Sequence, residues 1–188
     1  TIMNKGQIES RLIEGNNRYI KDEEDLKSDV LLRQKLTDGQ HPFAIVLSCA
    51  DSRVVPEMIF DCNIGELFVV RVAGNIANSS SIASIEYAVA NIGCELIVVL
   101  GHESCGAVTA TIKGGDNGKN LNHLCSYISP SIELADDVQV NSVVKANAKY
   151  NAELLVKNSE IISGFVNSGK LKIQPAYYSL ANGKVDFL

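Results

Sequence analysis

The sequence has no apolar run of the roughly 18 residues that a membrane-spanning helix needs. It has no excess of positive charge either. The formal net charge is -5, which argues against a nucleic-acid or anionic-membrane partner, because neither attracts an acidic surface. Signs of disorder are also missing, since 46% of the residues are hydrophobic and 21% are charged. We find no internal repeat, low-complexity tract or linker in the 188 residues, and we predict one folded domain.

The chain also lacks a signal-peptide pattern and a disulfide pattern. Residues 1–5 have no apolar core of the kind that a secretory signal contains. Five cysteines is an odd number, and Cys62, Cys94 and Cys125 show no paired spacing, so we expect packed free thiols rather than a disulfide framework. Free thiols are typical of proteins in a reducing compartment, so we expect a cytoplasmic protein. A targeting segment removed before Thr1 is the alternative.

What is present is an alternation of strand-like and helix-like segments. Three short, continuous apolar runs lie at residues 43–47, 67–72 and 96–100. Such runs are typical of strands buried on both faces. Apolar residues at helical spacing predict one helix over Gln7–Lys21 and another over Ile82–Ala90, the second with Ser79–Ser81 as N-caps. The alternation predicts βαβ units, and therefore an α/β fold with a central, mostly parallel sheet flanked by helices.

The remaining segments are assigned from the same patterns of apolar spacing and turn residues. They are a charged stretch at 22–29, a glycine-rich loop at 113–118, a helical region at 121–166 with breaks near 129–130 and 140–141, a strand at 171–178 and a turn at 182–183.

Two short motifs carry the candidate chemistry. Cys49-x-Asp51-x-Arg53 directly follows the first apolar run, and His102-x-x-Cys105 directly follows the third. In parallel sheets, functional residues gather beyond the carboxyl ends of the strands, so we expect the two motifs to meet. Two thiols and one imidazole form a three-ligand zinc set, and three protein ligands leave one coordination position open for chemistry. The alternatives are core residues that never meet, and a closed structural zinc site completed by Asp51.

Other zinc and phosphate motifs do not fit these residues. The His102-Glu103 pair lacks the second histidine of a His-Glu-x-x-His protease, because residue 106 is glycine. The Pro-Cys-x-x-Cys of zinc deaminases is absent, and the loop at 113–118 lacks the end of a phosphate-binding loop. We interpret Glu103 as a solvated or structural carboxylate. We interpret His41 and His123 as surface residues rather than proton shuttles.

Residues 48–53 (SCADSR) and 101–106 (GHESCG) together resemble the β-class carbonic anhydrases. Pro56-Glu57, residues 65–75 (GELFVVRVAGN) and residues 84–87 (SIEY) also resemble stretches of that family. Either half of the Cys-x-Asp-x-Arg and His-x-x-Cys combination alone is a weak signal, but the combination is specific. We therefore take the resemblance as a guide to fold, activity and site.

The resemblance implies one β-carbonic-anhydrase-like domain over residues 1–188. Its parts are an N-terminal helical arm at 1–36 that packs on a dimer partner, a zinc-site core at 37–113, which the resemblance covers closely, and C-terminal helices and a strand at 114–188. It also implies an obligate homodimer, often assembled further, with one Zn²⁺ per chain near the subunit interface. The implied reaction is the reversible hydration of CO₂ to bicarbonate and a proton.

The residue types at the site predict how such a reaction works. Two thiolates cancel the charge of the zinc ion, so the ion acidifies its water less than it does in a three-histidine site. Asp51 can accept the hydrogen bond of a zinc-bound hydroxide and orient it, or it can bind the zinc and close the site. Arg53 competes for Asp51 with a bidentate guanidinium fork, so we expect the pair to act as a gate.

Four further residues are candidates for a substrate pocket. Phe68 and Tyr87 match family positions that line the CO₂ pocket. Gln40 has the spacing of an amide that hydrogen-bonds substrate in some family members. The backbone N–H of Gly106, which begins a helix beside the zinc, can serve a bicarbonate oxygen.

Several alternatives remain open at this point. One subset of the family is closed by bicarbonate and has a tryptophan shortly before the first ligand cysteine. This chain has no tryptophan and carries Val46 there, which favours the open subset, whereas Arg71, a candidate for the inhibitory site, is present. The same scaffold can also hydrolyse another heterocumulene, CS₂ or COS. A non-catalytic zinc-binding assembly protein is the third possibility, and the presence of Asp51 and Arg53 argues against it.

Overall fold

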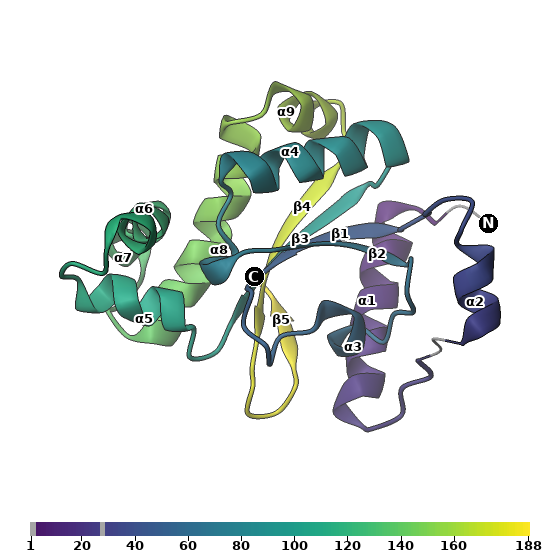
Figure 1. Cartoon of the computed structure of the whole chain (residues 1–188), viewed down its shortest axis with the longest axis horizontal. Helices are drawn as coiled ribbons and strands as arrows, with labels where there is room; N and C mark the ends of the chain where they lie inside the picture. The colour runs from purple at the N-terminus through teal and green to yellow at the C-terminus, as the bar shows by residue number, and fades with distance from the viewer. Residues whose placement is uncertain (1–2, 27–28) are drawn as a thin grey trace.

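A five-stranded sheet forms the centre of the part of the chain that the computed structural model describes, residues 3–26 and 29–188 (Figure 1). The strands are β1 (Ala44–Ser48), β2 (Leu67–Arg71), β3 (Leu96–His102), β4 (Lys172–Tyr178) and β5 (Val185–Phe187). They lie in the order β2-β1-β3-β4-β5; the first four are parallel to their neighbours, and β5 runs antiparallel to β4. The α/β fold class and the mostly parallel sheet predicted from the sequence are confirmed.

Helices surround this sheet within the same described ranges. They are α1 (Lys5–Ile20), α2 (Val30–Lys35), α3 (Pro56–Ile59), α4 (Ser79–Tyr87), α5 (Gly106–Lys113), α6 (Lys119–Ile128), α7 (Pro130–Leu134), α8 (Val140–Lys157) and α9 (Glu160–Asn167), with a 3₁₀ turn η1 (Ala73–Asn75) and a π turn η2 (Ala88–Ile92). None of the helices described is both long enough and apolar enough to cross a bilayer.

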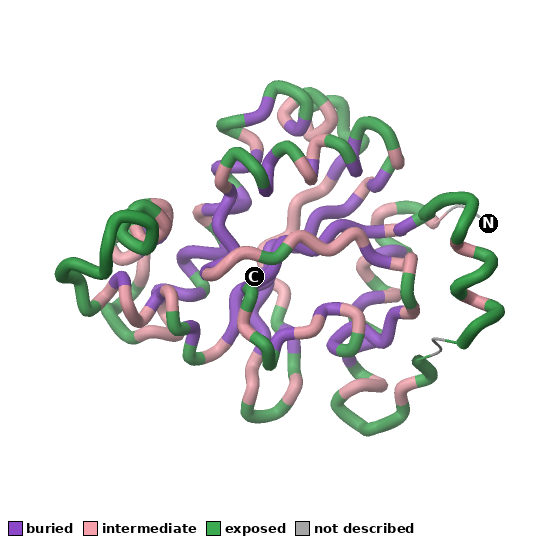
Figure 2. The backbone as a smooth tube through the Cα atoms, viewed as in Figure 1, coloured by how far each residue is buried: buried purple, intermediate pink, exposed green. Residues whose placement is uncertain are grey.

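Each face of the sheet has its own apolar core. All residues of the central strands β1 and β3 are buried (Figure 2), which explains why their sequences are continuously apolar. Side chains alternate across a strand, so Ile45 and Leu47 pack with α4, α8 and α9, whereas Ala44 and Val46 pack with α1 and α3. The sheet is therefore held rigidly from both sides, and the residues that follow β1 and β3 start from fixed positions.

Several boundaries differ from the sequence prediction. The N-cap of α4 is Asn78, whose side chain accepts a hydrogen bond from the N–H of Ser81, so Ser79–Ser81 form the first turn rather than the cap. The helix α2, the short helix α3 and the strand β5 were not predicted, and the helical region at 121–166 has a further break between α8 and α9. Residues 27 and 28 of the charged stretch, and residues 1 and 2, lie outside the described residues.

Helix α1 packs on its own chain. Ile8 and Leu12 are buried in the core under the sheet. The side-chain amide of Asn16 donates to the carbonyl oxygens of Ile59 and Gly183, and its oxygen accepts from the N–H of Val185. The helix is therefore an integral part of the fold of this chain. Contact of the arm at 1–36 with a second subunit, and the three-part division of the domain, stay predictions.

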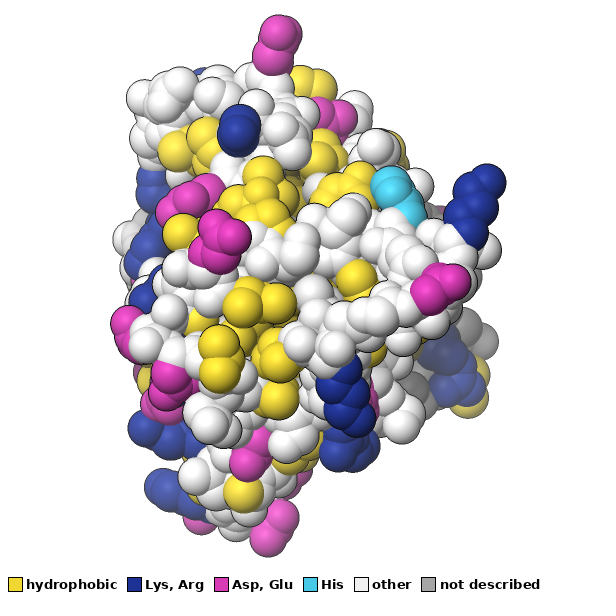
Figure 3. All heavy atoms as spheres, turned by 90° about the vertical axis from the view of Figure 1, so that its left-hand side faces the viewer, with side chains coloured by type: hydrophobic (Ala, Val, Ile, Leu, Met, Phe, Trp, Pro, Cys, Tyr) yellow, Lys and Arg dark blue, Asp and Glu magenta, His cyan; other side chains and the backbone are white. Residues whose placement is uncertain are grey.

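Helices α5, α6 and α7 lie together at one side of the molecule, where α5 begins directly after β3 (Figure 1). Figure 3 views this side and shows hydrophobic side chains at several places between charged ones. Leu134 and Val138 are among the most exposed large apolar residues described.

Candidate metal centre

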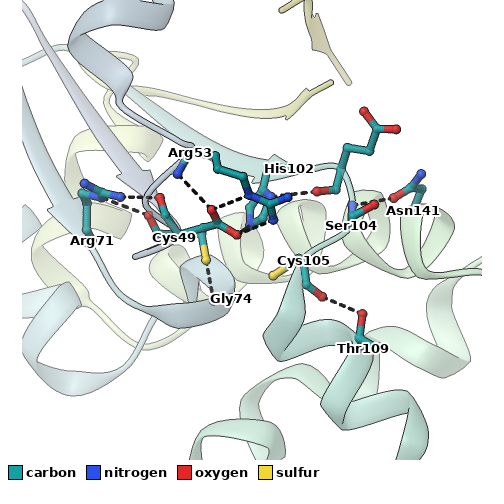
Figure 4. A network of polar contacts seen from close by, with 11 residues as sticks. Cys49, Arg53, Arg71, Gly74, His102, Ser104, Cys105, Thr109 and Asn141 are labelled. Atoms are coloured by element: carbon teal, nitrogen blue, oxygen red, sulfur yellow. Dashed lines mark hydrogen bonds and ion pairs between the residues drawn. The ribbon is translucent and has the colours of Figure 1, made fainter. Parts of the chain in front are cut away.

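The three predicted ligands converge at the carboxyl end of the sheet. Cys49 directly follows β1, His102 is the last residue of β3, and Cys105 immediately precedes α5. Because β1 and β3 are adjacent and parallel, their ends meet, and the two Sγ atoms and a ring nitrogen of His102 all lie within 4.8 Å of one another (Figure 4). All three residues are buried. The alternative in which these residues never meet is therefore wrong.

The imidazole of His102 is oriented for a metal. Its Nδ1 lies 2.9 Å from the carbonyl oxygen of Glu103, and since a carbonyl only accepts, Nδ1 carries the proton and Nε2 offers a lone pair. Among the described residues, Nε2 of His102 is a buried nitrogen with no hydrogen-bond partner. An orphaned buried polar atom costs about 1–3 kcal/mol, which a bound metal would offset. Two thiols and this nitrogen match the donors that zinc prefers, so the residues fit a zinc ion.

The two thiols are not equivalent. A hydrogen bond from Cys105 lowers the pKa of the Cys49 thiol, and the N–H of Gly74, 3.3 Å from Cys49 Sγ, acts in the same direction. The pKa of Cys105 is raised by the same thiol–thiol contact and by burial. The contacts of Cys49 with Cys105 and with the N–H of Gly74 therefore favour a thiolate in this pair, the form in which a thiol binds a metal.

Asp51 and Arg53 form the bidentate pair that their spacing predicts. Arg53 donates from Nε to Oδ1 of Asp51 at 2.9 Å and from Nη2 to Oδ2 at 2.7 Å, and its backbone N–H also donates to Oδ1 at 3.0 Å. These donors hold the pKa of the Asp51 carboxyl well below its usual range. Oδ2 of Asp51 lies 3.8 Å from Nε2 of His102, which is too long for a hydrogen bond but places an ionised carboxylate beside the ligand atoms.

Arg71 holds the backbone of the first motif. Its Nε donates to the carbonyl oxygen of Cys49 at 3.0 Å, and its Nη2 donates to that of Asp51 at 2.6 Å. Arg71 is the last residue of β2 and pairs in register with Ser48 at the end of β1. It therefore fixes the loop that carries Cys49 and Asp51. From the sequence, Arg71 was predicted only as a candidate residue of the inhibitory site, and its contact with the backbone of the first motif was not predicted.

The turn between His102 and Cys105 is held by residues that the motif alone does not reveal. Ser104 has a φ of 56°, in the left-handed region that non-glycine residues rarely adopt, and its N–H donates to Oδ1 of Asn141 at 3.0 Å. The carboxylate of Glu103 accepts from the Ser179 hydroxyl and from the N–H of Ala181, and these donors lower its pKa. Glu103 is thus a structural carboxylate, one of the two roles predicted for it.

The predicted pocket residues do not face the thiols of their own chain. Phe68 pairs in register with Ile45, three residues before the carboxyl end of the sheet, which corresponds to about 10 Å along the strand. The Phe68 ring lies 6.4 Å from that of Tyr87, which is half exposed at the end of α4. Gln40 is exposed and precedes β1, at the opposite end of the strand from Cys49. Gly106, by contrast, is the first residue of α5, next to Cys105.

The other cysteines and histidines lie apart from this centre. All five cysteines fall within the described residues and are free thiols. Cys62 and Cys94 are buried, and burial raises the pKa of each, to about 12 and about 11. His41 and His123 are exposed. The prediction of packed thiols is confirmed for the two buried cysteines, whereas Cys125 is only partly buried.

Comparison with known proteins gives consistent results. A family model described as carbonic anhydrase matches residues 44–185. The carbonic anhydrase of Mycolicibacterium smegmatis is 36% identical over 184 residues, which cover 93% of this chain and 89% of that relative. The β-carbonic anhydrase CafA of Aspergillus fumigatus superposes with a TM-score of 0.76 at 25% identity, over 84% of this chain and 80% of that one.

A further structure shares the fold. One of the two tetrameric β-carbonic anhydrases from Sordaria macrospora superposes with a TM-score of 0.76 at 23% identity, over 83% of this chain and 85% of that one.

Proposed function

Because the chain belongs to the β-class carbonic anhydrase family and is an enzyme of that family, we propose that it catalyses the reversible hydration of carbon dioxide to bicarbonate and a proton, with one zinc ion per chain. One observation carries the proposal. Two thiols and an unpartnered imidazole nitrogen converge in a buried site beside an ionised carboxylate. Three protein ligands with a free position are typical of catalytic rather than structural zinc.

In this proposal Cys49, His102 and Cys105 hold the metal. A zinc ion held there would lower the pKa of a water molecule and so supply a nucleophile for CO₂. Asp51 Oδ2, on the side of the ligand atoms, accepts a hydrogen bond from the attacking water and fixes its direction. Arg53 holds both carboxylate oxygens of Asp51, which keeps this side chain from taking the open position itself.

We further propose that a second copy of the chain completes the pocket for CO₂. Phe68 and Tyr87 lie at the outer side of the sheet, on and beside the edge strand β2, and do not reach their own Cys49. The residues Phe68–Val70 are only partly buried in the single chain, so a neighbour could cover them. A homodimer would bring the pocket residues of one chain to the metal of the other. The tetrameric relatives from Sordaria macrospora are consistent with assembly through such a contact.

The direct test is CO₂ hydration by zinc-quantified protein in a stopped-flow instrument with an indicator dye, at pH about 7 and about 8.5. Turnover at both values supports the paired arrangement of Asp51 and Arg53. Turnover only at the higher value supports the enzyme but favours a form in which Asp51 binds the metal. No turnover with full zinc occupancy contradicts the proposal, and a parallel assay with CS₂ and COS then separates another heterocumulene hydrolase from a non-catalytic protein.

Single variants separate metal binding from chemistry. Cys49→Ala is expected to lose zinc, whereas the matched variant Cys125→Ala, which changes a partly buried cysteine in α6, is expected to keep it. Asp51→Ala is expected to retain zinc and lose activity by about 100-fold or more. A wild-type rate in Asp51→Ala would contradict the orienting role of the carboxylate.

The free thiols also bear on location. Five unpaired cysteines support a reducing compartment, and we propose the cytoplasm. Alkylation of intact cells with a thiol-specific reagent, followed by peptide mapping, would contradict this placement if the cysteines were found oxidised.

A further inference from the structure

The backbone N–H and C=O of Gly74 connect a candidate metal ligand to helix α8. Gly74 lies in η1, directly after β2, and its N–H donates to Sγ of Cys49 at 3.3 Å (Figure 4). Its carbonyl oxygen accepts a hydrogen bond from Nδ2 of Asn147 at 2.8 Å. One residue therefore contacts the sulfur on one side and a buried amide, 73 positions away in the sequence, on the other.

The backbone conformation at Gly74 is tightly restricted, and with it the geometry of its two hydrogen bonds to Cys49 and Asn147. Gly74 has a φ of 71°, and a Cβ atom added there would lie 2.6 Å from Cδ1 of Ile128. The peptide that follows it is held at both ends, because its carbonyl oxygen binds Asn147 and its N–H, that of Asn75, donates to the carbonyl oxygen of Val72 at 2.9 Å. Since the φ and ψ rotations of Gly74 together relate this peptide to the preceding one, holding it also restricts the direction of the Gly74 N–H.

Asn147 is itself fixed by its surroundings. Its Oδ1 accepts from Nδ2 of Asn151 at 2.8 Å and from the Ser131 hydroxyl at 3.2 Å. Because both of these groups are donors, the amide cannot be flipped, and its NH₂ must point toward Gly74. Oδ1 of Asn151 in turn accepts from the N–H of Ala77 at 2.7 Å. Asn147, Asn151 and Ser131 are all buried, so the chain of contacts from α8 to the sulfur is shielded from water.

We propose that Asn147 is a positioning residue for the metal centre: by holding the carbonyl of Gly74, it aims the N–H of Gly74 at the sulfur of Cys49. A hydrogen bond to a ligating thiolate withdraws electron density from the sulfur and fixes the direction of its lone pairs, and contacts of this kind tune metal affinity. The inference rests on the proposed zinc site. No neighbour of Asn147 in the sequence carries a metal-binding motif, so its role follows from the fold alone.

The test compares two neighbouring asparagines of α8. Asn147→Ser removes the amide NH₂ that holds the carbonyl of Gly74 and leaves a small hydroxyl among the buried polar groups of Asn151 and Ser131. Asn151→Ala is the matched control, because it removes buried hydrogen bonds of the same network and leaves the contact between Asn147 and Gly74. Both variants should lose thermal stability, so stability alone does not decide between the roles.

The measurement that decides between the two roles is a spectroscopic signal from the sulfur of Cys49. In the Co²⁺-substituted protein, the thiolate-to-cobalt charge-transfer band is expected to move to lower energy in Asn147→Ser, because the sulfur loses its hydrogen bond, and to stay in place in Asn151→Ala. Zinc affinity, measured by competition with a chelator, is expected to fall by about 10-fold to 100-fold in Asn147→Ser only.

Two results would overturn the inference while leaving the metal centre intact: an unmoved band in Asn147→Ser, or equal loss of zinc affinity in both variants in proportion to their loss of stability. If wild-type protein showed no charge-transfer band with Co²⁺ and no zinc binding, the proposed function itself would fail. A second substitution, Asn147→Ala, repeats the measurement if Asn147→Ser does not fold.

Discussion

At the scale of single residues, one guanidinium holds the carboxylate that the proposed reaction needs. Among the described residues, Arg53 supplies the side-chain hydrogen bonds to both carboxylate oxygens of Asp51. The convergence of Cys49, Cys105 and His102 and the pairing of Asp51 with Arg53 could be predicted from the sequence. Each motif directly follows an apolar strand, and strand ends coincide in a parallel sheet. The left-handed backbone conformation of Ser104 could not be predicted from the sequence, because serine does not favour that conformation.

The lowered pKa of Asp51 predicts how stability depends on pH. An unfolded aspartate titrates near about 3.9, and Arg53 lowers the folded-state pKa below that value. The pair therefore contributes stability that is fully present above about pH 4 and is lost as the pH falls through the lower folded-state pKa. The difference in free energy of unfolding between wild type and Asp51→Asn should be constant from pH about 5 to 8 and shrink in acid. Urea titrations across this range measure it, and a difference that grew toward low pH would refute the pairing.

Thiol reactivity gives a second prediction at this scale. Alkylation requires the thiolate, and at pH about 8 a thiol with a raised pKa stays protonated. With pKa values of about 12 and about 11, Cys62 and Cys94 should resist iodoacetamide in the folded, zinc-loaded protein, while Cys125 is labelled. Peptide mass spectrometry identifies the labelled cysteine, and Cys125→Ser should remove the fast reaction. Labelling of Cys94 as fast as Cys125 would contradict the burial.

At the scale of secondary structure, the length of an element decided whether the sequence revealed it. Helix α1 and strands β1 and β3 were predicted closely because their apolar patterns are long or unbroken. Helices α2 and α3, with 6 and 4 residues, are too short to show helical periodicity. The cap of α4 was misassigned because Asn78 and the serines after it are comparable N-cap residues, and only the structure shows which one accepts the hydrogen bond.

Helix α1 lies so close to its own chain that one methyl group should disturb it. A Cβ atom on Gly15 would lie 1.9 Å from the carbonyl oxygen of Phe60, a backbone atom that cannot turn aside. We expect Gly15→Ala to destabilise the fold by about 1–3 kcal/mol or more. In the same helix, Gly6→Ala meets only the Asn4 side chain at 3.4 Å and should stabilise the helix by up to about 1 kcal/mol.

Denaturant titrations of Gly15→Ala and Gly6→Ala measure both effects with one protocol. Equal changes in the two variants would mean that α1 does not pack on its own chain as described.

At the scale of the whole molecule, the fold class could be predicted because alternating strands and helices have few stable arrangements. The position of the predicted pocket residues relative to Cys49 could not be predicted from the sequence. Gln40, Phe68 and Tyr87 were identified from resemblance alone, and no local pattern shows that they would lie away from their own Cys49. If a second copy of the chain completes the pocket, as proposed, these residues lie apart from the metal site within each single chain.

Subunit complementation tests whether the pocket is shared. Cys49→Ala lacks a metal ligand but keeps its pocket residues, and Tyr87→Ala keeps the ligands but has an altered pocket. If each pocket serves the partner's metal, a mixed dimer contains one intact site. Random mixing makes half of the dimers mixed, so activity should recover to about a quarter of wild type. Each variant alone, refolded identically, is the control. No recovery above the two variants alone would place the pocket within one chain.

The pairing of β4 with β3 has a consequence for the protein as it is made. His102 lies opposite Tyr178 in the sheet, and the N–H of Glu103 donates to the carbonyl oxygen of Tyr178. Synthesis at about 5–20 residues per second separates Cys105 from Tyr178 by roughly 4–15 s. Throughout that interval the nascent chain contains Cys49 and Cys105 but not the complete strand β4, which pairs with β3 beside them. The final geometry of the proposed metal site therefore forms only after residues as late as Tyr178 have been translated. The interval before that point is when Cys49 and Cys105 are most open to oxidation.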